Sequence, residues 1–409
     1  MIPFPNIEIL DPLGQTLNDF DVTDLTYNKV KGYAHKGEDD SGHKFEVNEE
    51  LGDTNIIIVN IGEQPRGVIG LMINAIDECK PMAIGLDVIF KDRKPDTLGD
   101  MVLAEAIKSS GKVVLASKFI YNKDSGEVAL QKSHDLFSSQ AQNSFVNLVT
   151  DGSDDIAKYK TSRSFYPRKD FKGIQHNFFA IDLAAKMDPH KAAQFLARNK
   201  EVEYINYVGN IAGYGDAMVK DIPKFYSIDY PDVLSRQFDP GLFRNKIVLM
   251  GFLGRNIGEQ DIEDIFYSPL NRKYVGKTNP DMFGVVIHAN IINMILSESY
   301  IDQVPSWIKG LMGFIICYIS VVVLYITFLA YPLLYGTLSK IVQLIFWLAL
   351  NFAMMGVFYK FRLKYDADIA VITVILAGDM VEIYHELVQP TAVKLYRLIF
   401  VKKEAVLLK

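Results

Sequence analysis

Asn55–Ile61 reads NIIIVNI and Met82–Phe90 reads MAIGLDVIF, and these two continuous apolar runs have the length of β-strands. The residues between them place apolar side chains at helical spacing, namely Val68, Met72, Ile73, Ile76 and Cys79. A strand, a helix and a second strand therefore follow one another, which is the unit from which parallel sheets are built.

The same alternation continues along the first 305 residues. Further strand-like runs are Lys112–Ala116, Glu203–Val208 and Lys246–Met250, whereas residues 179–185 and 285–296 have helical spacing. Strands that are apolar along their whole length are buried on both faces. The sequence therefore predicts an α/β fold with a largely parallel sheet flanked by helices.

The C-terminal part has the composition of a membrane protein. No Asp, Glu, Lys or Arg occurs in residues 310–339 or in residues 341–359. A helix of about 20 apolar residues can cross a bilayer, so a soluble cytosolic enzyme is excluded. We expect one domain over residues 1–305, followed by an α-helical transmembrane bundle and a short basic tail. The bundle would have three helices within residues 306–389, at about 308–331, 338–359 and 367–388, and the tail would be residues 390–409.

Charge predicts the orientation of these parts. The net charge of the chain is −6, and a net of +4 in residues 306–409 leaves −10 for the first 305 residues. An acidic domain argues against a nucleic-acid or anionic-lipid surface. The tail has five basic residues, against three in residues 360–364 after the second helix. Basic residues favour the cytoplasmic side, so we expect a cytoplasmic C-terminus and an extracytoplasmic first domain.

Three polar residues are candidates for a site, two in apolar surroundings and one in an acidic loop. Asp87 lies in a predicted strand and His288 in an apolar helix. A buried carboxylate needs a partner, so Asp87 either has a structural hydrogen bond, which we favour, or points into a crevice. His288 by itself is typical of a satisfied core histidine. Asp264 forms an acidic loop with Glu259 and Asp261, where a bound cation or, more commonly, a solvated loop is expected.

Catalytic motifs are absent from the sequence. Residues 271–278 approximate a P-loop but lack its first glycine, and Pro280 delays the following helix. The glycine-containing loop 251–258 follows a predicted strand, where either a ligand turn or, as we favour, a tight exit from the strand is expected. No GxSxG, CxxC or HExxH pattern occurs. We therefore predict no enzyme activity, no metal and no cofactor.

The third apolar helix has an acidic face. Asp379, Glu382 and Glu386 recur at intervals of three and four residues. Intramembrane acids are usually functional, so a proton path of an enzyme or transporter is one alternative. We favour a face that contacts a protein partner or emerges from the bilayer.

The order of these segments resembles the CHASE type 2 family, extracytoplasmic sensory domains that precede three transmembrane helices and accompany cyclases and histidine kinases. The segments that carry the resemblance over about residues 8–390 are Asp19-Phe20, Asp24-Leu25, IIIVNI at 56–61, Pro65-Arg66, AIGLDVIF at 83–90, VVLAS at 113–117, INYVG at 205–209, the strand from Lys246 to Gly251, Asp264 through Ser268-Pro269-Leu270, and GVVIHAN at 284–290. Family members usually have an acidic residue where this chain has Gly62, and they usually begin with a membrane helix that would end about where this sequence starts. The resemblance makes Arg66, Asp87, Asp264 and His288 candidates for ligand sensing, and we expect a leading helix to be missing from the sequence.

The resemblance implies a sensor in the cytoplasmic (inner) membrane of a bacterial cell envelope. Because about twenty residues follow Pro390, too few for a kinase or cyclase, we expect the signal to pass through the three helices to a separate partner. The alternative is a structural accessory subunit of an envelope complex that senses no ligand. Expected partners are membrane lipid, other membrane or envelope proteins and, in a homo-oligomer, further copies of this chain, with no nucleic acid.

Overall fold

A computed structural model describes residues 53–121, 127–148, 161–211, 224–257, 264–271, 280–365 and 368–396. Glu259 and Asp261, most of the P-loop-like segment, the early Asp19 and Asp24 motifs and the tail beyond residue 396 lie outside the described residues. The chain divides into two compact units, residues 1–301 and 302–409.

The first unit is built on one main sheet. Its strand order is β10-β1-β11-β2-β3, and β4 and β5 both pair with β3. Every pairing in it is parallel except that of β4 with β3, which confirms the predicted largely parallel sheet. The strands of this sheet are β1 (Asp53–Asn60), β2 (Ala83–Leu86), β3 (Val113–Tyr121), β4 (Val128–Gln131), β5 (Gln142–Phe145), β10 (Phe225–Ile228) and β11 (Ile247–Gly251).

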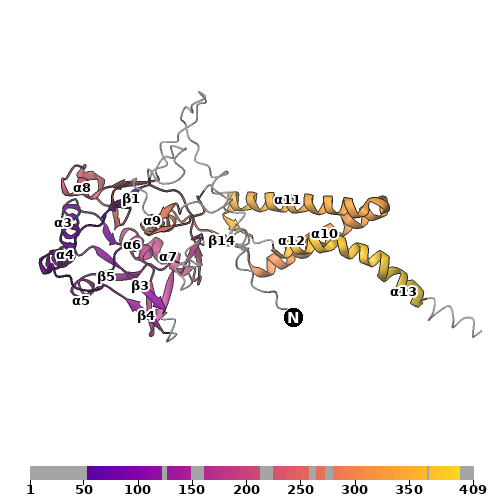
Figure 1. Cartoon of the computed structure of the whole chain (residues 1–409), viewed down its shortest axis with the longest axis horizontal. Coiled ribbons are helices and arrows are strands. Elements are labelled where there is room, and N and C mark those ends of the chain that lie inside the picture. Colours follow the sequence, from indigo (N-terminus) through magenta and orange to yellow (C-terminus); the bar gives the residue numbers. More distant parts are fainter. Residues whose placement is uncertain are drawn as a thin grey trace, which may run out of the picture. The chain divides into compact units, whose positions relative to one another are not determined.

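Helices cover both faces of this sheet (Figure 1). On one face, a single apolar core joins β1, β2 and β11 to α3 (Arg66–Asp77), α4 (Thr97–Ser110), α5 (Asp135–Ser138) and α8 (Tyr230–Leu234). On the other face lie α6 (Phe179–Met187) and α9 (Gly284–Leu296), with α7 (Pro189–Ala197) packed against both. A sheet covered in this way has apolar side chains on both faces, as its sequence predicts.

Two glycines let the helices approach the sheet closely. A Cβ atom on Gly85 would lie 2.6 Å from Cδ1 of Leu183 in α6, and one on Gly251 would lie 2.8 Å from Cβ of Val285 in α9. Real Cβ atoms essentially never approach a neighbour this closely. Larger residues at these positions would therefore push α6 and α9 away from the strands.

Small ladders complete the first unit. The antiparallel pairs are β6 (Ser164–Phe165) with β9 (Glu203–Tyr204), β7 (Arg168–Phe171) with β8 (Ile174–Asn177), and β12 (Ile265–Phe266) with β13 (Met282–Phe283). The run Glu203–Val208 was expected to be a strand of the sheet, and that expectation is wrong. Only its first two residues are β-structure, because the backbone amides of Asn206 and Val208 donate instead to Sδ of Met294 and Oδ1 of Asn290.

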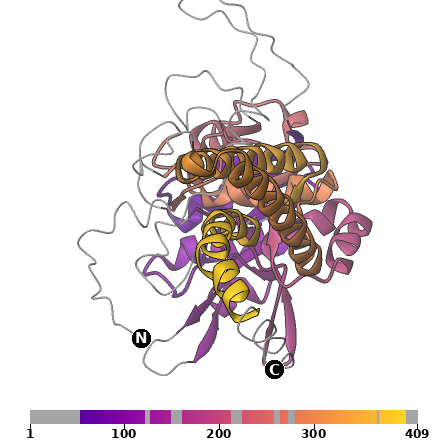
Figure 2. The ribbon, with the colours of Figure 1, turned by 90° about the vertical axis from the view of Figure 1, so that its right-hand side faces the viewer.

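The second unit is helical. Its main helices are α10 (Ser306–Ala330), α11 (Tyr335–Phe361) and α12 (Asp368–Ile383), which contact one another in every pairing (Figure 2). A π-helical turn (Tyr384–Val388) and α13 (Gln389–Tyr396) follow. A short parallel ladder joins β14 (Asp302–Gln303), which begins this unit, to β15 (Leu363–Lys364), which lies between α11 and α12.

Two of the three expected membrane spans have the required length and composition. Ser306–Ala330 and Pro332–Phe361 are long and apolar enough to cross a bilayer, with mean hydropathy of 2.4 and 2.0. α12 has 16 residues. At 1.5 Å per residue it is about 24 Å long, less than the roughly 30 Å of a bilayer core. The described residues therefore include two helices that are long and apolar enough to span a bilayer, and a third apolar helix that is short.

Candidate functional site at the carboxyl edge of the sheet

Three neighbouring strands end at the same level of the sheet. Asn60 of β1 pairs with Gly251 of β11, and Met250 of β11 pairs with Leu86 of β2. The crevice beyond the carboxyl ends of parallel strands is where ligands of such folds bind. Of the predicted site residues, Asp87 follows β2 directly, and Arg66 begins α3, the helix that comes next after β1, so both lie at this edge.

Asp87 and His288 come together at the carboxyl edge. The predicted strand 82–90 ends at Leu86, so Asp87 is the first residue after it, and its amide donates to the Met250 carbonyl at 2.9 Å. Oδ2 of Asp87 lies 3.7 Å from Nε2 of His288, whose side chain is 3% exposed. The ring centroids of Phe178 and Phe179 lie 5.3 and 5.2 Å from that of His288. This carboxylate and imidazole, which are 201 positions apart in the sequence, thus share one mostly apolar site.

Asp264 lies at the start of the helix that carries His288. Its carbonyl accepts from the Gly284 amide at 3.1 Å, and its backbone has a φ of 56°. A Cβ atom on Gly284 would lie only 3.1 Å from Oδ2 of Asp264, so the carboxylate is held against the first residue of α9. The N-terminus of a helix has a partial positive charge that favours a carboxylate at this place.

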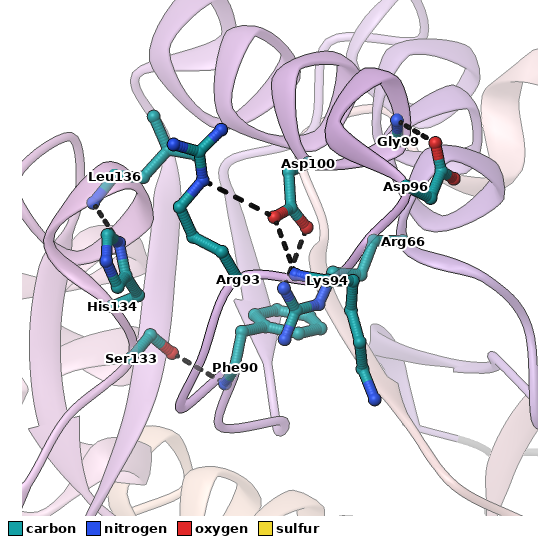
Figure 3. Close-up of polar contacts among 10 residues, drawn as sticks. All are labelled: Arg66, Phe90, Arg93, Lys94, Asp96, Gly99, Asp100, Ser133, His134 and Leu136. Carbon is teal, nitrogen blue, oxygen red and sulfur yellow. Dashed lines mark hydrogen bonds and ion pairs between the residues drawn. The ribbon is translucent and has the colours of Figure 1, made fainter.

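Arg66 belongs to a different cluster, shown in Figure 3. It is the first residue of α3, and its Nη1 donates to Oδ1 of Asp100 in α4 at 2.7 Å. The two side chains are 12% and 0% exposed. The guanidinium also lies over the rings of Phe90 and Phe137, at 5.2 and 5.3 Å from their centroids. A buried ion pair with aromatic contacts therefore joins the start of α3 to the first turn of α4.

Asp100 organises the loop between β2 and α4. Its Oδ2 accepts from the Lys94 amide at 3.0 Å and lies 4.0 Å from Nε of Arg93 (Figure 3). Burial opposes ionisation of Asp100, but the bonds from Arg66 and the Lys94 amide outweigh it and hold its pKa below the usual value. Asp96 caps α4 by accepting from the Gly99 amide at 3.0 Å. The loop is thereby fixed at three points.

The other end of this loop is bonded to the segment before α5. The amide of Phe90 donates to Oγ of Ser133 at 3.0 Å, and His134 caps α5 by accepting at Nδ1 from the amide of Leu136 at 3.1 Å (Figure 3). Phe90 therefore connects the Arg66 cluster to α5, since it contacts the guanidinium through its ring and Ser133 through its backbone.

The hydrogen-bonded centre of the carboxyl edge is Asn60. Its Nδ2 donates to Oδ1 of Asp229 at 2.7 Å and to the Gly254 carbonyl at 3.0 Å, while its Oδ1 accepts from the amides of Gly62 and Leu253 at 3.0 and 2.9 Å. These four bonds use the whole bonding capacity expected of one side-chain amide. These bonds fix the loop that begins at Gly251 as a tight turn out of β11. This is the alternative that we favoured from the sequence.

Sequence reasoning did not single out Asn60, Asp100 or Asp229 as site residues. Two of them had a usable signal. Asn60 is the one polar residue between the apolar ones of IIIVNI, and Asp100 shares a helical face with Leu103 and Ile107. A polar side chain on an apolar face must find a partner. Asp229 carries no such pattern, because it is the single residue that joins β10 to α8, where an aspartate is common.

The predicted acidic face of the second unit lies in the C-terminal part of α12 and in the π-helical turn that follows it. Oδ1 of Asp379 pairs with Nζ of Lys340 at 2.7 Å, and the two side chains are 51% and 61% exposed. Glu382 and Glu386 are exposed, within α12 and the π-helical turn. Among the described residues, no group of His, Cys, Asp or Glu could hold a metal ion.

Comparison with known proteins identifies the larger unit to which these clusters belong. The family model of the CHASE2 domain matches residues 50–326, which covers well over half of the chain. No curated protein and no solved structure matches the chain. The match includes every strand of the main sheet, together with most of α10. The resemblance found in the sequence is thus confirmed, and the chain belongs to the CHASE2 family of extracytoplasmic sensory domains.

Proposed function

We propose that this protein is an extracytoplasmic sensor, anchored in the cytoplasmic membrane, that passes a signal through its C-terminal helices to a separate partner protein. The observation that carries the proposal is the extent of the family match, which runs from β1 through the first 21 residues of α10. The sensory fold and the first apolar helix therefore form one family unit.

The β14–β15 ladder supports transmission within the helical unit. The amides of Asp302 and Val304 donate to the carbonyls of Arg362 and Lys364, both at 3.0 Å. Val304 also packs with Tyr365 and Ala370 in a small apolar cluster. A displacement at the start of this unit would therefore act on α10 directly and on α11 and α12 through the ladder.

A ligand can shift such a system only by binding one arrangement more tightly than the other. The sensing roles of Arg66, Asp87, Asp264 and His288 remain predictions. Within the described residues, each of them contacts other groups of the carboxyl edge. A ligand that changed one of these contacts would therefore displace the strands and helices that make it.

Purification with its partners tests the proposed function. The full chain is isolated in mild detergent from its own membranes, and mass spectrometry quantifies the proteins that co-elute. We expect a signalling enzyme such as a histidine kinase or cyclase in substoichiometric amount. A stoichiometric envelope or transport protein would instead favour the structural-subunit alternative.

A variant pair locates the contact. Glu382→Gln with Glu386→Gln removes two exposed charges from the proposed partner-facing surface and is expected to reduce recovery of the partner. Glu105→Gln changes an exposed glutamate on α4 and serves as the matched control. Equal recovery with both variants would argue against this face as the contact.

A further inference from the structure

A cavity in the first unit lies apart from the carboxyl-edge clusters. It has a volume of about 260 Å³ and is formed by β7, β8, the end of α7 and β9. Pockets for drug-sized ligands measure roughly 300–1,000 Å³, so this one suits a smaller molecule. Its lining includes Pro167, Arg168, Phe195, Leu196, Glu201 and Glu203.

The lining has an apolar wall and charges of both signs. Pro167, Phe195 and Leu196 form the apolar part, and Pro167 and Phe195 are buried. Glu203 is buried too, and Nε of Arg198 and Nζ of Lys200 lie 2.7 and 3.7 Å from its carboxylate oxygens. The negative charge of Glu203 is therefore balanced by neighbouring cations of the same turn.

Two further charges of the lining are available to a ligand. Arg168 and Glu201 are exposed, and neither forms an ion pair with any other residue that the structure describes. They have opposite charge and come from different elements, β7 and the turn between α7 and β9. An arginine can bind a carboxylate with two parallel hydrogen bonds, and a glutamate can accept from an ammonium group.

We propose that this cavity binds a small zwitterion of the size of a free amino acid. Arg168 binds the carboxylate, Glu201 accepts from the ammonium group, and the side chain of the ligand packs on Phe195 and Leu196. The assignment rests on the proposed function, because it names the ligand site and the ligand class of the sensory domain.

The walls of the cavity contact the last residues of the first unit. The rings of Phe195 and Tyr300 have centroids 5.4 Å apart, and the Arg198 guanidinium lies 4.4 Å from the centroid of Tyr300. Tyr204, beside Glu203 in β9, forms a β-bridge with Ile301. A ligand against Phe195 and Glu203 is therefore one side chain away from Tyr300 and Ile301, at the point where the first unit ends.

Direct binding to the purified full chain in detergent tests this assignment. Each of the twenty common amino acids is added separately at millimolar concentration, and the shift in melting temperature is measured, since a ligand that binds only the folded state raises it. The best ligand is then titrated by calorimetry beside its analogues without the amino group or without the carboxylate. We expect at least one amino acid to bind. Both analogues should have an affinity at least about tenfold lower, since a charged hydrogen bond contributes about that factor.

Variants on the rim assign the binding to the cavity. Arg168→Gln and Glu201→Gln are each expected to weaken binding of that amino acid about tenfold. Both side chains are exposed, so the folded state should tolerate the changes. Lys172→Gln, on the turn of the same β7–β8 hairpin but outside the lining, is the control and should leave affinity unchanged.

The outcomes are decisive without reference to any partner. Failure of all twenty amino acids to bind the wild-type chain overturns the ligand class, and binding that Arg168→Gln leaves unchanged overturns the site. The co-purification experiment is independent of both results, so a sensor with a different ligand is distinguished from a protein that is no sensor.

Discussion

Asp100 and Asp281 are carboxyl groups of the first unit whose surroundings shift their pKa values in opposite directions. The Arg66 guanidinium and the Lys94 amide overcome burial at Asp100 and lower its pKa. At Asp281 burial dominates the bonds from Ser268 and Asn271, and it raises the pKa to about 6. The difference follows from the partners, since one carboxylate has a cation and the other has only neutral donors.

Asp100→Asn tests the structural role of the Arg66 cluster. It leaves the mostly buried Arg66 without its counter-charge, so we expect a loss of about 3 kcal/mol in the free energy of unfolding. Because the folded pKa of Asp100 is lowered, its contribution is present above its unfolded pKa of about 3.9 and is lost as pH falls through the folded value. Chemical denaturation of the full chain in detergent measures this loss. Asp77→Asn removes the more exposed pair with Lys112 and should cost less than about 1 kcal/mol, and equal losses would contradict the prediction.

Asp281→Asn tests the opposite shift. Between about pH 4 and 6 the folded chain keeps the proton of Asp281 that the unfolded chain has lost, so wild-type stability falls as pH rises through this window. The variant lacks this dependence. Its stability relative to wild type should therefore increase by on the order of 1 to 2 kcal/mol from pH 4 to 7, as measured by denaturation at several pH values. A relative stability that is constant with pH would show that this carboxyl has an ordinary pKa.

At the scale of elements, the ladder between β14 and β15 is the contact that links three helices. Asp302 pairs with Leu363, and Gln303 pairs with Lys364. These residues stand 61 positions apart in the sequence and have no apolar strand pattern. Sequence periodicity could not predict the pairing, because a two-residue ladder depends on where α10 and α11 place its two halves.

A disulfide tests this register. In a chain with Cys79→Ala and Cys317→Ala, the pair Asp302→Cys and Leu363→Cys should crosslink on mild oxidation, because paired residues of a ladder have neighbouring Cβ atoms. Mass spectrometry of the linked peptides measures the yield. The control pair Asp302→Cys and Lys364→Cys places the two sulfurs on opposite faces of the ladder and should crosslink poorly. A higher yield for the control would show that the register is shifted.

At the scale of the whole molecule, the prediction concerns the side of the membrane on which each part lies. The chain with Cys79→Ala and Cys317→Ala receives one new cysteine at a time, at Asp302, Leu333 or Leu395. Spheroplasts that contain each variant are treated with a maleimide that does not cross the membrane. An extracytoplasmic first unit predicts labelling at Asp302, and a first crossing by α10 predicts that Leu333 reacts only after permeabilisation. Leu395 lies beyond α12 and should behave as Leu333 does if α12 crosses. Labelling of the Leu395 position in intact spheroplasts would show that only α10 and α11 cross the membrane.

Prediction from the sequence succeeded where one element is decided by its own residues. The apolar runs at Asn55–Ile61 and Lys246–Met250 are β1 and β11, and the charge-free stretches after residue 310 are α10 and α11. It failed at Glu203–Val208, where side chains of distant residues bond to the backbone and end the strand early. For the candidate site, the sequence pointed to Arg66, Asp87 and His288 as polar residues. Their partners came only from the structure, which pairs Arg66 with Asp100 and Asp87 with His288.

The sequence by itself determined the fold class, the two long apolar helices and the family, because apolar periodicity and the order of motifs are local properties of the chain. Only the tertiary structure decided that β11 lies between β1 and β2, that Asp100 neutralises Arg66, and that the cavity residues contact Tyr300. These contacts join residues that are 34 to more than 180 positions apart. Their geometry is set by packing, such as the approach of Val285 to Gly251, which no local pattern encodes.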